Sequence, residues 1–296
     1  MKVLVITGDR RFGPGHPRFE LQRSAVDNLT VVYWGRGNWW PKIPAGHFEV
    51  VTGQDPFLRG HLAGHIAQWK GARLNIQVHT DLDAQSWIRR IFARIQLRHA
   101  DSIRVVSEKI KRQVELLGVK APVVVLPVYL DVQKFSAIVR QPHDGKTILW
   151  VGRFEDEKDP LKALEILRRV RAHGMDANLV MLGAGSIESA LRAAAEGLPV
   201  KFPGWNDPRA YLQVADAVVC TSKHESWGES IIEALAAGVP VVSPDVGVAK
   251  EAGAKVVSRD ELADGVLEVL KSGERGKLLI TLLSAEEWAR QWKESL

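Results

Sequence analysis

The segment Thr221–Val242 reads TSKHESWGESIIEALAAGVPVV and has the densest pattern in the chain. A strand that ends near Thr221 leads into a loop containing Glu225, and Gly228 lets the backbone turn before a helix begins. Gly238-Val239-Pro240 ends that helix and leads into the apolar run Val239 to Ser243. This order of strand, loop, helix and strand predicts a βα unit in a parallel sheet.

The same segment predicts a ligand site. Free N–H groups at the helix start, Gly228, Glu229 and Ser230, favour an anion such as phosphate. Glu225 and Glu233 are eight residues apart, about two helical turns, so both carboxylates can face one pocket. Carboxylates suit sugar hydroxyls better than phosphates. Either glutamate alone is also typical of a surface residue, but together with the helix start they indicate a phosphorylated sugar.

Short β-branched runs alternate with amphipathic stretches on both sides of this segment, which predicts an α/β fold with parallel sheets. The expected strands are 3–7, 30–34, 48–52, 74–79, 103–107, 123–126, 147–151, 178–182, 200–202, 217–221, 239–243 and 255–257. The expected helices are 18–28, 57–69, 84–98, 108–117, 160–171, 187–196, 229–237 and 261–271.

A chain of 296 residues has room for two domains of about 150 residues each. The polar stretch 137–146 is typical of a linker. We therefore expect one domain over 1–136 and a second over 146–283. In two doubly wound domains that face each other, the carboxyl ends of the strands lie around the cleft, so we expect the ligand site there.

Composition narrows the class of protein. With 46% hydrophobic and 25% charged residues, the chain is globular rather than disordered or fibrous. The single Cys220 excludes an internal disulfide and a cysteine zinc cluster. No apolar run is long enough for a signal peptide or a membrane span, so a cytoplasmic location is expected.

The net charge of +5 is unevenly distributed. Residues 1–140 carry an excess of ten positive charges, and residues 141–296 an excess of five negative charges. A basic N-terminal half suggests an anionic partner such as a phospholipid surface or nucleic acid, although many basic surfaces are simply solvated.

Five elements, in order, resemble a known family. Glu225, Gly228 and Glu233 with Gly238–Val242 are similar to the E-x7-E segment of retaining glycosyltransferases of the GT-B fold, glycosyltransferase family 4 (group 1). The other four elements are Val151-Gly152-Arg153 with Lys158 (G-R-x4-K), Gly183-Ala184-Gly185 (G-x-G), Val200–Gly204 (V-x-F-x-G) and Gly247 with Glu251. The resemblance is specific over residues 147–252.

The resemblance implies two facing Rossmann-like domains and a retaining, metal-independent transfer of sugar from a UDP- or GDP-sugar. The donor diphosphate would lie against Arg153, Lys158 and the helix start, the ribose on Glu233, and the transferred sugar on Glu225. The implied donor-binding residues are Gly152, Arg153, Lys158, Gly183, Gly185, Gly204, Glu225, Ser226, Trp227, Gly228, Glu229, Ser230 and Glu233. No cofactor is expected beyond the donor substrate.

The first half resembles the family more loosely. His79-Thr80 is similar to the family's active-site histidine, which adds His79 to Arg153, Lys158 and Glu225 as a catalytic residue. The family's Gly-Gly loop is replaced by residues 8–17, where Gly13 and Gly15, with His79, would lie on the acceptor side. The expected acceptor is a glycan, either lipid-linked or part of the cell envelope. As in other GT-B proteins, the last helix, 284–296, is expected to pack back on the N-terminal domain.

Three further motifs have alternative interpretations. Asp81-Leu82-Asp83 spells the D-x-D of metal-dependent glycosyltransferases, but three-residue matches are common and no metal site is expected. Trp39-Trp40-Pro41-Lys42 and the arginine-rich segment Trp87–Arg94 are typical of a peripheral enzyme that dips into an anionic membrane. Buried tryptophans with a solvated arginine face explain these two segments equally well.

Other classes of function remain open. A nucleotide-sugar epimerase or a phosphorylase could share the fold, although no lysine motif for a phosphorylase cofactor is present. A non-catalytic protein that binds anionic surfaces would explain the basic half but not the donor pattern. Nucleic acid is not expected as a partner.

Overall fold

The computed structural model describes residues 1–296, which divide into two compact units. Unit 1 comprises Met1–Tyr129 and Leu283–Leu296, and unit 2 comprises Leu130–Leu282. Each unit is built on one parallel six-stranded sheet with helices, which confirms the predicted α/β class. Residues 130–136, expected in the first domain, lie in unit 2.

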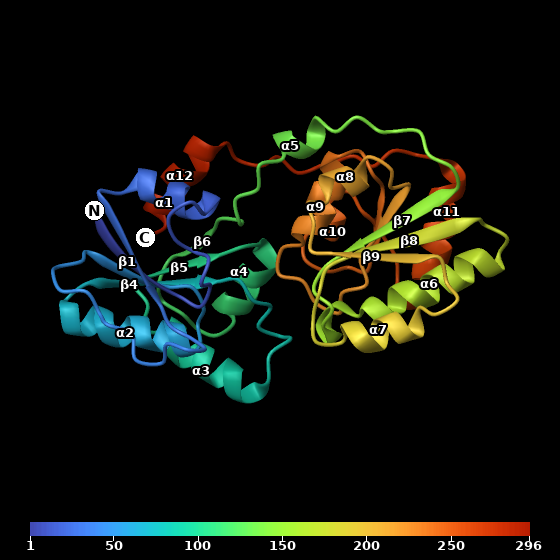
Figure 1. The fold of residues 1–296 in the computed structure, drawn as a ribbon. Coiled ribbons are helices and arrows are strands. Elements are labelled where there is room, and N and C mark those ends of the chain that lie inside the picture. The colour runs from blue at the N-terminus through green and yellow to red at the C-terminus, as the bar shows by residue number, and fades with distance from the viewer. The chain divides into compact units, whose positions relative to one another are not determined.

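The sheet of unit 1 has the strand order β2-β1-β3-β4-β5-β6. Its strands are β1 (Lys2–Thr7), β2 (Asn28–Tyr33), β3 (Val50–Gly53), β4 (Arg73–Val78), β5 (Ser102–Val105) and β6 (Val123–Val125). Its helices are α1 (Pro17–Ala25), α2 (Leu58–Lys70), α3 (Trp87–Leu97), α4 (Glu108–Glu115) and α12 (Ala285–Glu294). Figure 1 shows α1 and α12 together on one face of this sheet and α2 on the other.

The C-terminal helix α12 belongs to the core of unit 1. Trp288 and Trp292 are four residues apart, so they share one face of the helix, and both are buried. They pack with Val3 and Val5 of β1 in one apolar cluster. The indole N–H of Trp288 also donates a 2.8 Å hydrogen bond to the carbonyl oxygen of Pro127. The last segment of the chain is therefore fixed by both packing and hydrogen bonding.

Unit 2 repeats the architecture with the strand order β12-β11-β10-β7-β8-β9. Its strands are β7 (Lys146–Val151), β8 (Ala177–Leu182), β9 (Val200–Gly204), β10 (Ala217–Val219), β11 (Val241–Ser243) and β12 (Lys255–Val256). Its α-helices are α5 (Gln133–Ser136), α6 (Pro160–Ala172), α7 (Glu188–Ala194), α8 (Arg209–Leu212), α9 (Glu229–Ala236), α10 (Ala249–Ala252) and α11 (Leu262–Ser272). Two 3₁₀ turns complete the unit, η1 (Asp156–Lys158) and η2 (Arg259–Glu261).

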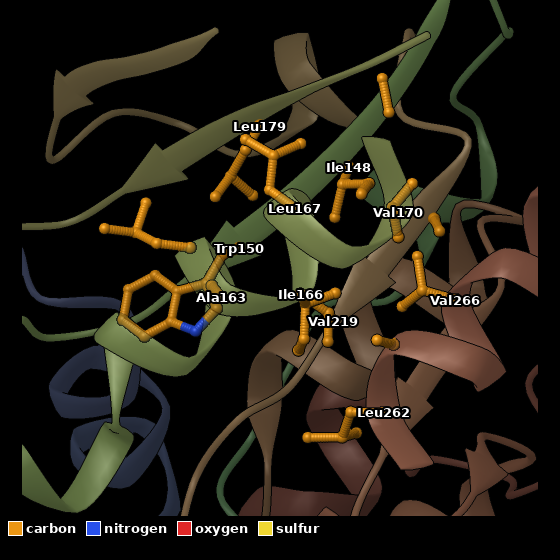
Figure 2. Packing of buried hydrophobic residues seen from close by; sticks show 14 of the residues in the cluster. Ile148, Trp150, Ala163, Ile166, Leu167, Val170, Leu179, Val219, Leu262 and Val266 are labelled. Atoms are coloured by element: carbon orange, nitrogen blue, oxygen red, sulfur yellow. The ribbon is translucent and has the colours of Figure 1, made fainter. Parts of the chain in front are cut away.

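The core of unit 2 follows from the periodicity of its elements. Alternate residues of β7, Ile148 and Trp150, lie on one face of the sheet. They pack with Leu167 of α6, Leu179 of β8 and Val266 of α11, as Figure 2 shows. Burial of this continuous apolar layer fixes the positions of the strand ends, and with them the loops that follow each strand.

The strand order of unit 2 indicates where a ligand would bind. From β7 the chain runs outward through β8 and β9, and it then returns to place β10 on the other side of β7. The connections after β7 and β10 therefore diverge, which is the position where parallel α/β sheets bind ligands. None of the helices has the length and apolar character needed to cross a bilayer.

Candidate active site

Hydrogen bonds from other elements of unit 2 fix the loop that follows β10. The indole N–H of Trp150 donates to the Thr221 hydroxyl at 2.8 Å, and that hydroxyl donates to the carbonyl oxygen of Lys158, also at 2.8 Å. The guanidinium of Arg259 donates to the carbonyl oxygens of Thr221 and Ser222 at 2.6 and 3.1 Å. These bonds join the loop after β10 to the loop after β7.

Lys158 and Glu225 meet where these two loops join. The Lys158 ammonium lies 2.5 Å from Oε1 of Glu225, and the same oxygen accepts a 2.8 Å hydrogen bond from Ser222. Their side chains are 19% and 14% exposed, so the pair is only partly shielded from solvent. Both were predicted as site residues with separate ligands, whereas in the structure they form an ion pair with each other.

The pair retains capacity for a ligand. An ammonium has three donors, and a carboxylate has a second oxygen. Lys158 can therefore donate to an anion, and Glu225 can accept from a hydroxyl, without the pair being broken. A ligand with an anionic group beside a hydroxyl-rich group matches this arrangement.

Helix α9 begins beside this pair. Gly228 is its N-cap, with a left-handed φ of +98° and no side-chain capping bond. The first-turn N–H groups carry the positive end of the helix dipole. Ser226 and Ser230 are half-buried, Trp227 is buried and Glu229 is exposed. The structure therefore places the predicted donor residues 226–230 in one turn.

Glu233, one turn further along α9, is a neutral carboxyl at physiological pH. Its burial, together with the negative charges of Glu229 and Asp207, raises its pKa to about 8. A protonated carboxyl can both donate and accept a hydrogen bond. This property suits a diol such as ribose. The raised pKa of Glu233 was not predicted from the sequence, where its side chain was expected to be an ordinary carboxylate.

The predicted glycines allow loops to approach each other closely. A Cβ atom on Gly183 would collide with the carbonyl oxygen of Gly152, and one on Gly185 would collide with the main chain that follows β7. Gly247 makes a similar approach to the loop that carries Glu225. By contrast, Gly204 ends β9 with open space around its Cβ position. Packing alone thus accounts for three of these glycines.

Arg153 is not joined to the Lys158–Glu225 pair by any contact. Its exposed side chain forms an ion pair with Glu157 in the same turn. An exposed pair of this kind contributes little to stability and exchanges readily. Arg153 can therefore reorient toward an anion at modest cost.

In unit 1, His79 follows directly after β4. Its ring is half-buried, and Nε2 lies 3.3 Å from Oε1 of Gln77. Burial, reinforced by the charges of Arg104 and Arg18, lowers the pKa of His79 well below its usual value. The imidazole is therefore neutral at physiological pH.

The loop after β1 carries Gly13 and Gly15. Gly15 has a left-handed φ of +87° and donates its N–H to the carboxylate of Glu20 at 2.9 Å. A Cβ atom would meet nothing at either glycine. Only Gly15 therefore has a conformational reason for its identity.

The D-x-D carboxylates are engaged within unit 1. Although burial alone would favour a neutral carboxyl, hydrogen bonds from Lys109 and Gln113 lower the pKa of Asp81. Asp83 accepts a hydrogen bond from Gln113 and forms an ion pair with Arg90. No group of three or more His, Cys, Asp or Glu side chains has the geometry of a metal site.

Two residues that hold this site were not predicted. Ser222 donates to Glu225, and Arg259 fixes the loop and also pairs with Asp159. Asp159 is the only non-glycine residue with a left-handed φ, +46°. Ser222 could have been suspected because it precedes Glu225 in the decisive segment. Nothing in the sequence around Arg259 indicates its role, because only the tertiary structure brings η2 to the loop after β10.

Comparison with known proteins identifies the class. Residues 145–292, half of the chain, match the family described as glycosyl transferases group 1. The chain therefore belongs to the group 1 glycosyltransferases, as its motifs suggested.

Two curated relatives illustrate the range of the family. A glycogen synthase of Mycobacterium tuberculosis is 30% identical over 200 residues, which cover 64% of this chain and 46% of that protein. A GDP-mannose-dependent alpha-(1-6)-phosphatidylinositol dimannoside mannosyltransferase of the same organism is 29% identical over 256 residues, 79% of this chain and 61% of that protein. The chain thus spans between about half and three fifths of these relatives.

Among solved structures, Anabaena HepE in complex with UDP-glucose aligns with a TM-score of 0.73 and 14% identity over 99% of this chain and 94% of that one. The sucrose-phosphate synthase of Thermosynechococcus elongatus aligns with a TM-score of 0.72 and 16% identity, covering 99% and 93%. At such identity the similarity concerns the fold, and it supports the assignment of the GT-B architecture.

Proposed function

We propose that the protein is a retaining, metal-independent glycosyltransferase that moves a sugar from a UDP- or GDP-sugar to an acceptor. The observation that carries this proposal is the Lys158–Glu225 pair beside the start of α9. The pair offers a cation for a diphosphate and a carboxylate for sugar hydroxyls at one point. Family membership, and relatives whose names include GDP-mannose or UDP-glucose, support a nucleotide sugar as donor.

In this proposal each group has a role. Lys158, Arg153 and the first-turn N–H groups of α9 hold the diphosphate, and Glu225 accepts hydrogen bonds from the transferred sugar. The protonated Glu233 binds the ribose hydroxyls. Unit 2 thus binds the donor, and unit 1 binds the acceptor and contributes His79.

The chemistry needs stabilisation of the leaving group. As the bond between the anomeric carbon and the diphosphate oxygen breaks, negative charge grows on the diphosphate. Fixed positive groups aimed at that oxygen lower the barrier, because they need no reorganisation during the step. Lys158 is fixed by Glu225, and the helix end is fixed by the core. Neutral His79, assigned to the acceptor side, can accept or donate a hydrogen bond without adding charge.

We also propose that the acceptor is presented at an anionic membrane surface, to which α3 binds. The outward face of α3 exposes five large apolar side chains, Trp87, Ile88, Ile91, Phe92 and Ile95. Its opposite face is buried through Ala93, Gln96 and Leu97. Arg90, Arg94 and Arg98 follow one flank at four-residue spacing. An apolar stripe flanked by arginines matches the interface of an anionic bilayer.

The loop at Trp39 and Trp40 strengthens this second proposal. These side chains are 59% and 93% exposed, so burial does not explain them. Tryptophan prefers the interface between water and lipid. A lipid-linked acceptor would be held at the same surface.

Calorimetric titration with UDP and GDP tests the donor site. Wild type should bind at least one of them, and Lys158→Ala should bind it roughly ten- to a hundredfold more weakly, the effect of losing a charged hydrogen bond. Lys162→Ala is the matched control, because Lys162 forms an ion pair with Glu165 on α6. Equal binding by all three proteins would refute the proposed donor site.

A further inference from the structure

Arginines gather at the carboxyl edge of the unit 1 sheet, outside the proposed donor site. The loops after β1 and β2, the first turns of α1 and α2, and the end of β5 each supply one: Arg10, Arg36, Arg18, Arg59 and Arg104. Among these five, only Arg59 forms an ion pair, with Asp55 at 2.7 Å. Most of the positive charge at this edge therefore has no acidic partner.

Arg104 is the most unusual member, because it is only 2% exposed. Its guanidinium donates to Oε1 of Gln77 at 2.9 Å and to the carbonyl oxygens of Leu126 and Pro127 at 3.0 and 2.8 Å. It also lies 5.2 Å from the ring centre of Trp288. All these partners are neutral, so a buried charge is hydrogen-bonded but not compensated, an arrangement that is normally costly.

Arg18, at the same edge of the sheet, adds a second charge that has no ion pair. It lies half-buried on the first turn of α1, with no ion pair and no side-chain hydrogen bond. The next residue, Phe19, packs in the same apolar cluster as Leu126 and Trp288, which both contact Arg104. The charge of Arg18 contributes to lowering the pKa of Arg104, so the two like charges repel each other, and a shared anion would relieve that repulsion.

The pKa values of Arg104 and His79 are consistent with an excess of positive charge at this edge of the sheet. Burial, followed by the charge of Arg18, lowers the pKa of Arg104 to about 9. Burial and both arginines also lower the pKa of His79. The side chain of Gln77 links them, since its Oε1 lies within hydrogen-bonding distance of both Arg104 and His79. The positive potential therefore extends to the residue proposed for the reaction.

We propose that Arg18, together with the uncompensated charge of Arg104, forms an anion site in unit 1 that binds a phosphate group of the acceptor. This inference rests on the proposed function, because it names the acceptor class of the same enzyme. Arginine forks and the positive end of α1 favour a phosphate, which accepts several hydrogen bonds at once. The phosphate could belong to a phospholipid headgroup or to a soluble sugar phosphate.

The test is a titration with three probes: inorganic phosphate, glucose 6-phosphate and monomeric dihexanoyl phosphatidic acid. Saturating UDP and GDP are present, so that the phosphate site proposed in unit 2 is occupied. Wild type is compared with Arg18→Gln and with Arg23→Gln. Arg23 lies on the same helix but is exposed and forms a 2.7 Å ion pair with Glu20. Neither substitution removes a buried contact, so both variants should fold.

We expect Arg18→Gln to bind phosphate at least tenfold more weakly and Arg23→Gln to bind as wild type does. Tighter binding of phosphatidic acid would identify a lipid acceptor, and tighter binding of glucose 6-phosphate a soluble one. Equal binding by Arg18→Gln and wild type, or an equal loss in both variants, would overturn the anion site. Titration with UDP and GDP alone separates the two claims, because a failure there contradicts the donor site and leaves this site standing.

Discussion

At the scale of single residues, the fold creates pairs and protonation states that determine the chemistry of the candidate site. Lys158 and Glu225 are 67 residues apart in sequence and form one ion pair. Glu233 is held neutral by burial and by two neighbouring acids. Both features determine which form of the site can receive a ligand.

The pairing predicts a large kinetic effect. Lys158→Ala should lower the rate of donor cleavage on the order of a hundredfold, the effect of deleting one preorganised group. Glu225→Gln should also slow cleavage, because it removes the negative charge that holds Lys158 and replaces one of the two oxygens that can accept hydrogen bonds from the sugar. Initial rates of UDP or GDP release measure this, with Lys162→Ala as control. Unchanged rates in both site variants would contradict the assignment.

The neutral state of Glu233 predicts a dependence on pH. Its pKa in the folded protein, about 8, lies above the ordinary value of 4.5. The folded state therefore holds the proton more tightly, and stability should fall as pH rises between these two values. Glu233→Gln should not show this part of the loss. Urea denaturation from pH 5 to 9 compares the two proteins.

Nucleotide binding gives a second measure of the same group. If the protonated carboxyl donates to ribose, the affinity of wild type for UDP or GDP should decrease through about pH 8. The affinity of Glu233→Gln should remain flat there. Parallel pH profiles for both proteins would rule out this role.

At the scale of elements, the sequence predicted the strands well. Each of the twelve predicted strands overlaps one in the structure, because β-branched runs bounded by turn residues carry the signal locally. The short helices α5, α8 and α10 were not predicted, since four residues are too few to show a helical period. Arg104 was expected in a strand, but nothing in its neighbours revealed that its charge is buried.

The candidate site likewise contains residues that the sequence could predict and features that it could not. Glu225, Gly228 and Lys158 could be predicted because their spacing reflects local turns and the family pattern. Two features could not be predicted, because they depend on side-chain geometry or tertiary contact: the ion pair of Arg153 with Glu157 and the hydrogen bonds from Arg259 to the loop.

The interpretation of Trp39, Trp40 and Trp87 as buried is wrong, since all three are largely exposed.

A charge placed in the exposed apolar stripe of α3 should weaken binding to membranes. Ile91→Glu should reduce partition onto vesicles containing anionic lipid by about tenfold, because it places a negative charge in the apolar stripe. Leu116→Glu is the matched control, since Leu116 is 87% exposed at the end of α4. Sedimentation with vesicles at two salt concentrations measures the effect. Equal partition onto neutral and anionic vesicles would argue against the surface.

Helix α12 predicts an effect on stability alone. Trp292 is fully buried in unit 1, so Trp292→Ala should lower the free energy of unfolding by about 3 to 5 kcal/mol. Trp40→Ala, at a side chain that is 93% exposed, should change it little. Chemical denaturation distinguishes the two. A stable Trp292→Ala protein would show that α12 is dispensable for the core of unit 1.

At the scale of the whole molecule, the two α/β units differ in the charged groups that they carry at the ends of their strands. Unit 2 holds the Lys158–Glu225 pair at a strand crossover, and unit 1 holds arginines without ion pairs at the carboxyl edge of its sheet. We propose that the diphosphate of the donor binds the fixed cations of unit 2 and that an anionic acceptor binds the arginines of unit 1. The central claim is that fixed cations of unit 2, without a metal ion, stabilise the departing diphosphate.

The most direct test measures UDP or GDP release from nucleotide sugars in the presence of EDTA, for wild type, Lys158→Ala and Asp81→Ala. Asp81→Ala is included because it removes the first carboxylate of the D-x-D motif. We predict that wild type remains active with the chelator and that Lys158→Ala loses on the order of a hundredfold, while Asp81→Ala, if folded, keeps its activity. If EDTA or Asp81→Ala abolishes release while Lys158→Ala remains active, the account is contradicted.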